Sequence, residues 1–250
     1  MFANKKMSIN HQLAQLYSTH WGDLIKHGEQ LCPLIQTNPM LLKFDESAFT
    51  SASKRILISG QETWGWDEFG TSVEDGMAGY FRFFIERQFY PGYWKSAFWK
   101  AFRYFEEEFS RLFGKDNCTF IYQNLSKVGR NDDKTGVTAE IRQLERDHFP
   151  VLRDEMAILK PDIVLFLSGP NRDDDIRFHF PDVQFSMAGT ESNLRRLAWL
   201  SSRDLPVASL RLYHPSYYRA WTNEYRSSVV GLISQRGEPS APANRASPRR

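Results

Sequence analysis

The 250-residue sequence has few cysteines, little net charge and no long hydrophobic run. Its two cysteines, Cys32 and Cys118, rule out a disulfide framework and supply no CxxC pair for zinc. The formal net charge of +2 neither supports nor excludes nucleic-acid binding, because a local basic face can be hidden in the sum. No apolar run approaches the roughly 18 residues of a membrane span, and no signal-peptide core follows Lys5 and Lys6. We therefore expect a cytoplasmic protein with no membrane partner.

The remaining composition is typical of a globular chain, with 41% hydrophobic and 25% charged residues. The length allows one large α/β domain with a substantial core, which we expect to span residues 1–235. Within it we expect a helical extension over about residues 9–45 and an aromatic insertion over about residues 64–113. Residues 236–250 are mainly Gly, Pro, Ser, Ala and Arg, which predicts a disordered tail.

Four short apolar runs are each followed at once by polar or glycine-bearing sequence. Such runs predict buried strands, and Gly60 after the first run permits a sharp turn. Ligands bind outside the carboxyl ends of strands in an open α/β sheet, so the residues that follow the four runs should converge on one cleft. We expect a three-layer α/β/α sandwich with a central, mostly parallel four-stranded sheet. The runs are 56–58, 119–122, 162–167 and 207–212, and the converging residues are Glu62, Asn124, Gly169 and His214.

The rest of the chain favours helices. Helical spacing or flanking signals predict them over residues 138–148, 151–159, 194–200 and 223–235. The acidic stretch 172–175 is predicted to form a loop.

Short motifs stand at the predicted strand ends, in a characteristic order. They are Gly60-Gln61-Glu62, Asn124-Leu125-Ser126-Lys127, the segment 160–169, and His214-Pro215-Ser216-Tyr217-Tyr218. Over roughly residues 55–235 this set resembles the uracil-DNA glycosylase superfamily. The resemblance implies a monofunctional DNA glycosylase that flips out a deaminated or modified base and hydrolyses its N-glycosidic bond. Such an enzyme would act in DNA repair or in defence against phage whose DNA carries modified bases.

Breaking an N-glycosidic bond makes the sugar oxocarbenium-like and the leaving base an anion. The protein must therefore position water on the sugar side and donate hydrogen bonds on the base side. The resemblance implies that Glu62 positions the water and that His214, as a neutral imidazole, stabilises the leaving base. It also implies that Asn124 reads the base, because an amide can pair with a donor and an acceptor on a pyrimidine edge. The sequence departs from the family at Glu62, where relatives use Asp or Asn and one branch tolerates Ala, and at Thr63, where many relatives have proline.

Other residues are expected to complete the site. In the strict uracil enzymes a tyrosine near the position of Trp64 blocks C5 substituents, so a tryptophan implies a differently shaped pocket. The aromatic, glycine-rich stretch 64–94 is expected to wall this pocket, because flipped bases are held by stacking on aromatic side chains. We expect further base contacts from Gln61, Trp64 and Tyr80, and DNA contacts from Ser168, Ser216, Tyr218 and Arg219.

The predicted reaction requires no metal and no organic cofactor, and we expect a monomer whose partner is DNA. Some relatives hold an iron–sulfur cluster, which takes four cysteines, more than this chain contains. A lyase step would need an amine nucleophile, and the nearest candidate, Lys127, is weakly placed for it.

Two other functions remain open. A non-catalytic nucleic-acid-binding module on the same fold would bind without releasing a base, since a fold does not determine activity. A metal-dependent hydrolase would use Asp173, Asp174, Asp175 and His179, which share one stretch without helical ligand spacing. A serine hydrolase is disfavoured because the sequence contains no G-x-S-x-G motif.

Overall fold

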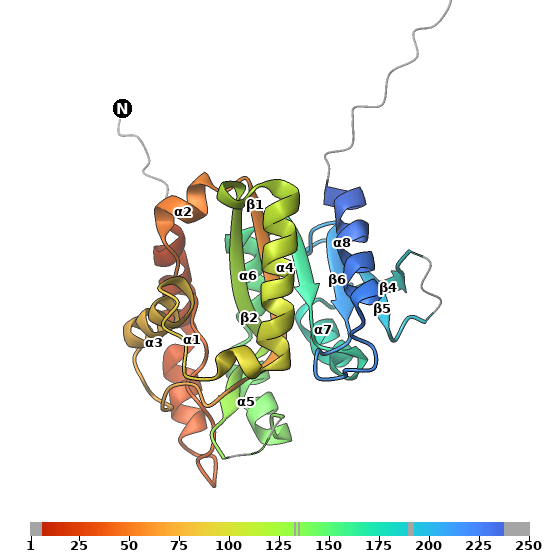
Figure 1. The fold of residues 1–250 in the computed structure, drawn as a ribbon. Coiled ribbons are helices and arrows are strands. Elements are labelled where there is room, and N and C mark those ends of the chain that lie inside the picture. The colour runs from red at the N-terminus through yellow and green to blue at the C-terminus, as the bar shows by residue number, and fades with distance from the viewer. Residues whose placement is uncertain (1–6, 133, 135, 190–192, 238–250) are drawn as a thin grey trace, which may run out of the picture.

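A computed structural model describes residues 7–132, 134, 136–189 and 193–237 (Figure 1). Among these residues, the strands form one six-stranded mixed sheet in the order β2-β1-β3-β6-β5-β4. β2, β1, β3 and β6 run parallel to one another, whereas β5 pairs antiparallel with both β6 and β4. The strands are β1 (Lys54–Trp64), β2 (Cys118–Arg130), β3 (Ile163–Phe166), β4 (Gln184–Met187), β5 (Leu197–Ser201) and β6 (Ala208–Leu212).

The predicted α/β class is confirmed, and the four predicted runs form the parallel part of the sheet. The prediction of a four-stranded sheet is wrong, because β5 and β4 extend it beyond β6. The helix predicted over residues 194–200 is also wrong. Leu197, Ala198, Trp199 and Leu200 are buried in succession, as in a strand covered on both faces, and they pair with β6 and β4.

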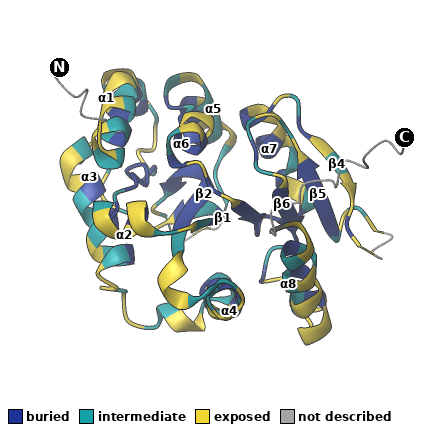
Figure 2. Cartoon of the chain, turned by 90° about the horizontal axis from the view of Figure 1, so that it is seen from above, coloured by how far each residue is buried: buried dark blue, intermediate teal, exposed yellow. Residues whose placement is uncertain are grey.

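Helices cover both faces of the sheet (Figure 2). α4 and α8 lie on one face, and α5, α6 and α7 lie on the other. α1 lies outside this second layer and contacts α3, α5 and α6. The helices are α1 (Ile9–Gly28), α2 (Glu46–Ser51), α3 (Val73–Tyr80), α4 (Ala97–Phe113), α5 (Ala139–His148), α6 (Leu152–Leu159), α7 (Asp173–His179) and α8 (Asn223–Gly237).

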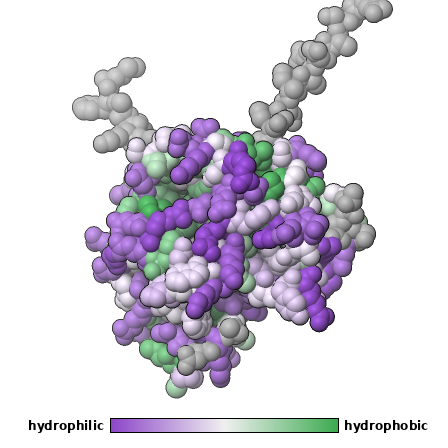
Figure 3. Space-filling view, viewed as in Figure 1, coloured by the Kyte–Doolittle hydropathy of each residue, from purple (hydrophilic) through white to green (hydrophobic). Residues whose placement is uncertain are grey.

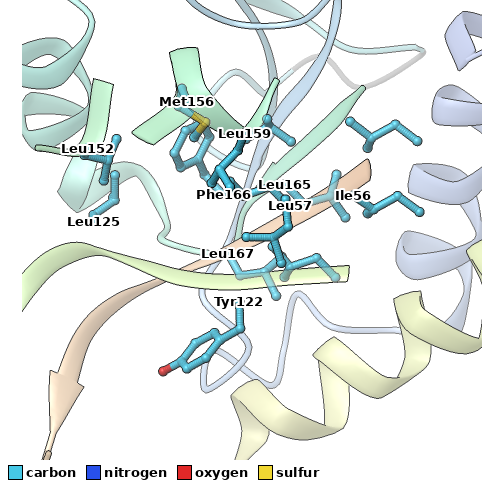
Figure 4. Close-up of a cluster of buried hydrophobic side chains, with 14 of the residues drawn as sticks. Ile56, Leu57, Tyr122, Leu125, Leu152, Met156, Leu159, Leu165, Phe166 and Leu167 are labelled. Atoms are coloured by element: carbon cyan, nitrogen blue, oxygen red, sulfur yellow. The ribbon is translucent and has the colours of Figure 1, made fainter. Parts of the chain in front are cut away.

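The core lies between the sheet and these helical layers. Side chains from β1 and β3 meet Leu152, Met156 and Leu159 of α6 (Figure 4). On the opposite side, α4 buries Phe102, Phe105 and Phe109 at helical spacing, as its aromatic pattern predicts. The aromatic insertion is therefore largely helical, with a π-helical turn (Phe81–Ile85) after α3 and a short 3-10 turn at Tyr93–Lys95. A second 3-10 turn, Lys115–Asn117, follows α4 and leads into β2.

The sharp turn predicted at Gly60 does not occur. β1 continues to Trp64 and stays paired with β2 well past the end of β3, with one irregularity between Glu62 and Trp64. Gly60 is needed for a different reason: a Cβ there would come within 3.0 Å of the Asn124 amide oxygen on the paired strand. The glycine therefore permits the close approach of Asn124.

The acidic loop predicted at residues 172–175 is wrong, because Arg172 ends a 3-10 turn (Pro170–Arg172) and Asp173 begins α7. Hydrophilic side chains cover most of the face shown in Figure 3, with apolar residues in small separate patches. No helix in the described ranges has both the length and the apolar character needed to cross a membrane. Of the predicted tail, residues 238–250 lie outside the described part of the chain.

Candidate active site

The sheet topology creates a crevice at the carboxyl ends of β1 and β3. From β1 the chain moves through α4 to β2 on one side, and then through α5 and α6 to β3 on the other side of β1. The connecting helices consequently lie on opposite faces of the sheet (Figure 2). Such a switch point is where open α/β sheets bind ligands. Gln61 spans it, since its side-chain Nε2 donates a hydrogen bond to the backbone oxygen of Ser168, beyond the end of β3.

A cavity of about 660 Å³ opens at this crevice. Glu62, Asn124 and His214 line it, although they are far apart in the sequence. Gly169, the fourth residue expected there, lines an adjoining hollow of about 370 Å³ that shares Gln61, His214 and Ser216 with the cavity. The cavity lining also includes Gly60, Gln61, Trp64, Trp66, Asp67, Phe83, Tyr90, Phe98, Trp99, Tyr122, Gly136, Arg172 and Ser216.

Glu62 enters the cavity from the extended end of β1. Its Oε1 accepts a hydrogen bond from the backbone N–H of Gly136, at 3.1 Å. Its Oε2 is buried and lies 3.4 Å from Nη1 of Arg172, and no donor within the described residues hydrogen-bonds to it. Oε1 keeps a lone pair after accepting one hydrogen bond, so this oxygen can also accept one from a water molecule.

His214 follows β6 and presents a defined ring nitrogen. Its Nδ1 lies 2.7 Å from the hydroxyl of Ser216 and 3.3 Å from the backbone nitrogen of Ser216. A backbone N–H can only donate, so Nδ1 is the acceptor and the neutral ring carries its proton on Nε2. Burial, and to a lesser degree the charge of Arg172, lowers the pKa of His214 to about 4. At neutral pH His214 is therefore an uncharged donor.

Asn124 lies on β2 directly opposite Gly60 and is almost fully buried. Its Nδ2 donates a hydrogen bond to the hydroxyl of Tyr122, at 3.1 Å. The second N–H of the amide and Oδ1 remain to form a donor–acceptor pair. Gly60 has no side chain, which leaves space for this amide, so the position of Asn124 depends on the glycine.

Aromatic side chains form much of the wall. Phe98 and Trp99 begin α4 and pack against the ring of Tyr122, with centroids 5.4 and 4.7 Å away. Trp64 lines the cavity but keeps 62% of its surface exposed, so it lies at the rim. Trp66 also lines the cavity, and its indole N–H is buried without a hydrogen-bond partner among the described residues. From the 64–94 stretch that was expected to wall the pocket, Trp64, Trp66, Phe83 and Tyr90 line the cavity, whereas the rest of the aromatic wall comes from α4 and β2.

Arg172 is the site residue that the sequence motifs do not reveal. It ends the short 3-10 turn after β3, and its side chain is 8% exposed. Nη2 donates hydrogen bonds to the backbone oxygen of Gln61, at 3.2 Å, and to Ser126 Oγ, at 2.6 Å. Its only sequence signal is a positive charge five residues after the predicted strand 162–167, which is too common to single it out.

Several expected contacts fall elsewhere. Tyr80 is fully buried outside the cavity lining and donates its hydroxyl hydrogen bond to the backbone oxygen of Tyr122, at 3.0 Å, so its expected base contact is wrong. Ser168 is buried and lines only the adjoining hollow. Tyr218 and Arg219 are exposed beyond the cavity lining, so their DNA contacts stay predictions.

The hydroxyl of Ser216 contacts His214, which gives this serine a role within the site. Lys127 is fully buried and lies 2.7 Å from Glu155 on α6, outside the cavity lining, so its amine cannot reach a substrate there.

The acidic residues of the alternative metal site are already engaged with cations. Asp173 pairs with Arg211, Asp174 with Arg177, and Asp175 with Arg172 and Arg146. The described residues include no group of three or more His, Cys, Asp or Glu side chains that could hold a metal ion. These pairings give the acidic stretch a structural role.

A comparison with models of protein families and with curated proteins finds no match for this sequence.

Proposed function

We propose that the chain is a monofunctional DNA glycosylase that flips out a deaminated or modified base and hydrolyses its N-glycosidic bond, leaving an abasic site. One observation carries the proposal. A carboxylate, an amide and an uncharged imidazole donor converge on one aromatic-walled cavity at the switch point of the sheet. Their chemistry matches the needs of this reaction, and they stand on the motifs that resemble the uracil-DNA glycosylase superfamily.

In the proposed reaction, the flipped base stacks on the aromatic wall and pairs with the Asn124 amide. Water held by Glu62 attacks the anomeric carbon of the sugar as the bond between that carbon and the base nitrogen breaks. The bonding electron pair leaves with the base, and a proton of the water passes to Glu62 and then to solvent. The N–H on Nε2 of His214 donates a hydrogen bond to the base oxygen where negative charge develops.

A neutral imidazole suits this last step because the donor must remain a donor throughout the reaction. With a pKa of about 4, His214 is uncharged at neutral pH, and the contacts of Nδ1 with Ser216 keep the proton on the nitrogen that is free to face the cavity. The electrostatic preorganisation of such donors supplies a large share of many enzymatic rate enhancements.

In this proposal one copy of the chain acts on DNA in the cytoplasm. The base itself separates two biological roles. Release of uracil or hypoxanthine would indicate repair, whereas release of only a bulky modified cytosine would indicate action on modified phage DNA.

Base release tests the proposal directly. The purified chain is incubated in EDTA with single- and double-stranded oligonucleotides that carry uracil, hypoxanthine, hydroxymethylcytosine or glucosylated hydroxymethylcytosine. Abasic sites are then detected by alkaline cleavage. His214→Ala should abolish most of the release, and the matched control His11→Ala changes an exposed histidine on α1, outside the cavity lining. Salt-sensitive binding without abasic sites on any substrate would contradict the proposal and support the non-catalytic binding module.

A further inference from the structure

Arg172 lines the cavity beside Glu62. Its guanidinium contacts three elements at once: Gln61 and Glu62 on the extended part of β1, Ser126 on β2 and Asp175 on α7. A planar guanidinium with five donors in a rigid fork can hold such a set in one geometry, whereas a lysine ammonium cannot. The arginine thus ties the strand that carries Glu62 to the helix layer.

The contact with Glu62 has a clear electrostatic purpose. A buried carboxylate oxygen without a hydrogen bond is costly unless a nearby positive charge compensates it. Glu62 Oε2 is such an atom within the described residues, and Nη1 of Arg172 lies 3.4 Å away. Because Oε2 of Glu62 lies against Arg172, Oε1 is the carboxylate oxygen that can accept hydrogen bonds at the cavity.

We propose that Arg172 is a positioning residue that fixes the orientation of the Glu62 carboxylate, so that Oε1 faces the water that attacks the sugar. This inference rests on the proposed glycosylase function. Arg172 itself touches no reacting atom in this scheme, and it acts through Glu62.

Contacts with Asp175, Ser126 and Gln61 hold Arg172 in place. Its Nε lies 2.8 Å from Asp175 Oδ2, and Oδ1 of the same aspartate lies 2.8 Å from Nη2 of Arg146 on α5. Asp175 is itself nearly buried, with 8% of its side chain exposed. Ser126 Oγ and the Gln61 backbone oxygen accept hydrogen bonds on the other side of the guanidinium. The arginine therefore has little freedom to follow a moving Glu62, as a positioning role requires.

The same guanidinium also acts on His214. The charged or titratable side chains that line the cavity with it are Glu62, Asp67, Tyr90, Tyr122 and Arg172. Of these, the positive charge of Arg172 contributes to the low pKa of His214, after burial. Removal of Arg172 should thus move the His214 pKa from about 4 toward its ordinary value of 6.5. This shift can be measured in the absence of substrate.

The test compares Arg172→Gln, Arg172→Lys and the control Arg177→Gln. Arg177 is on α7 as well, but its side chain is half-exposed, pairs with the exposed Asp174 and lies over the ring of Phe185, outside the cavity lining. Base release is measured as kcat and KM on the substrate that the wild-type chain cleaves. The His214 ring is titrated by NMR, and circular dichroism melts confirm that each variant is folded.

For Arg172→Gln we expect kcat to fall on the order of 100-fold with little change in KM, because a misplaced catalytic group costs about that much. The His214 pKa should rise in this variant. Arg172→Lys keeps the charge but not the fork, so it should leave His214 near the wild-type pKa while kcat still falls. Arg177→Gln should match the wild type in both measurements.

The outcomes separate this inference from the function on which it rests. A wild-type chain that releases no base overturns the proposed function and the positioning role together. An active wild type with equally active Arg172→Lys and Arg172→Gln variants overturns the positioning role alone. A slow Arg172→Gln variant that is fully rescued by Arg172→Lys would also refute positioning by the fork, because charge alone would then suffice.

Discussion

Replacement of Gly60 by alanine should disable the site while leaving the fold largely intact. The new Cβ would lie within 3.0 Å of Asn124 Oδ1 and 3.2 Å from Cε2 of Phe98. The backbone of β1 cannot yield easily, because it pairs with β2 on one side and, through the preceding residue Ser59, with β3 on the other. The flexible end of the Asn124 side chain must therefore move, and it loses its 3.1 Å hydrogen bond to the Tyr122 hydroxyl.

The expected magnitude follows from these contacts. The loss of the Asn124–Tyr122 hydrogen bond and the crowding at Phe98 together should lower the free energy of unfolding by about 1–3 kcal/mol. In the proposed reaction the displaced amide also loses its two hydrogen bonds to the base. At about 0.5–1.5 kcal/mol each, these amount to roughly 1–3 kcal/mol of transition-state stabilisation. That loss corresponds to a fall in kcat/KM of about 5- to 150-fold.

The measurement is kcat/KM for base release together with urea unfolding. Gly22→Ala is the matched control, because Gly22 lies inside α1 and a Cβ there meets no atom within 4 Å. It should retain the wild-type rate and gain about 0.5–1 kcal/mol of stability. Gly60→Ala combined with Asn124→Ala should be no slower than Asn124→Ala alone, since both changes remove the same contacts. A Gly60→Ala variant with wild-type kcat/KM would refute the assignment of Asn124 as base reader.

Further predictions concern buried polar groups around the sheet. Lys127→Met should lower the free energy of unfolding in urea by about 3–5 kcal/mol, because it leaves the fully buried carboxylate of Glu155 without its positively charged partner. Adding Glu155→Leu to this variant should recover part of the lost stability. Burial lowers the pKa of His179 to about 4 from an ordinary 6.5, so this histidine makes the protein less stable as pH falls from 6.5 toward 4. His179→Gln should reduce the pH slope of the unfolding free energy in that window by up to about 1.4 kcal/mol per pH unit, and equal slopes in variant and wild type would contradict the assignment. Tyr80→Phe removes a buried hydrogen bond to the backbone oxygen of Tyr122, so it should lower the free energy of unfolding by about 1 kcal/mol, measured by thermal unfolding, with no change in base release. A large loss of activity in this variant would instead indicate that Tyr80 contacts the base.

The parallel part of the sheet and the convergence of its strand ends are predictable from local patterns. β3 and β6 are short and buried, and the longer β1 and β2 each contain a short apolar run. Such runs are visible without any knowledge of their partners. The carboxyl ends of parallel strands share one edge of a sheet, so Glu62, Asn124 and His214 were expected to meet, and they do line one cavity. Helices α5 and α6 also begin and end within about two residues of their expected bounds.

Other features depend on partners that are distant in the sequence. The spacing of Leu197 and Leu200 suits a helix as well as a strand, and pairing with β6 on one side and β4 on the other decides the conformation. A glycine after an apolar run suggests a turn, yet β1 continues past Gly60 because β2 offers a long parallel partner.

Residue types and their order along the chain therefore determined the α/β class, the parallel strands and the edge at which the site forms. The tertiary structure decided the rest: the buried ion pair of Lys127, the core position of Tyr80, the ring nitrogen that His214 presents, and the arrival of Arg172 beside Glu62. The physical reason is that hydrophobic periodicity is a property of neighbouring residues, which the sequence displays directly. Hydrogen bonds and ion pairs between buried polar groups depend on distances across the fold, and these exist only once the chain is packed.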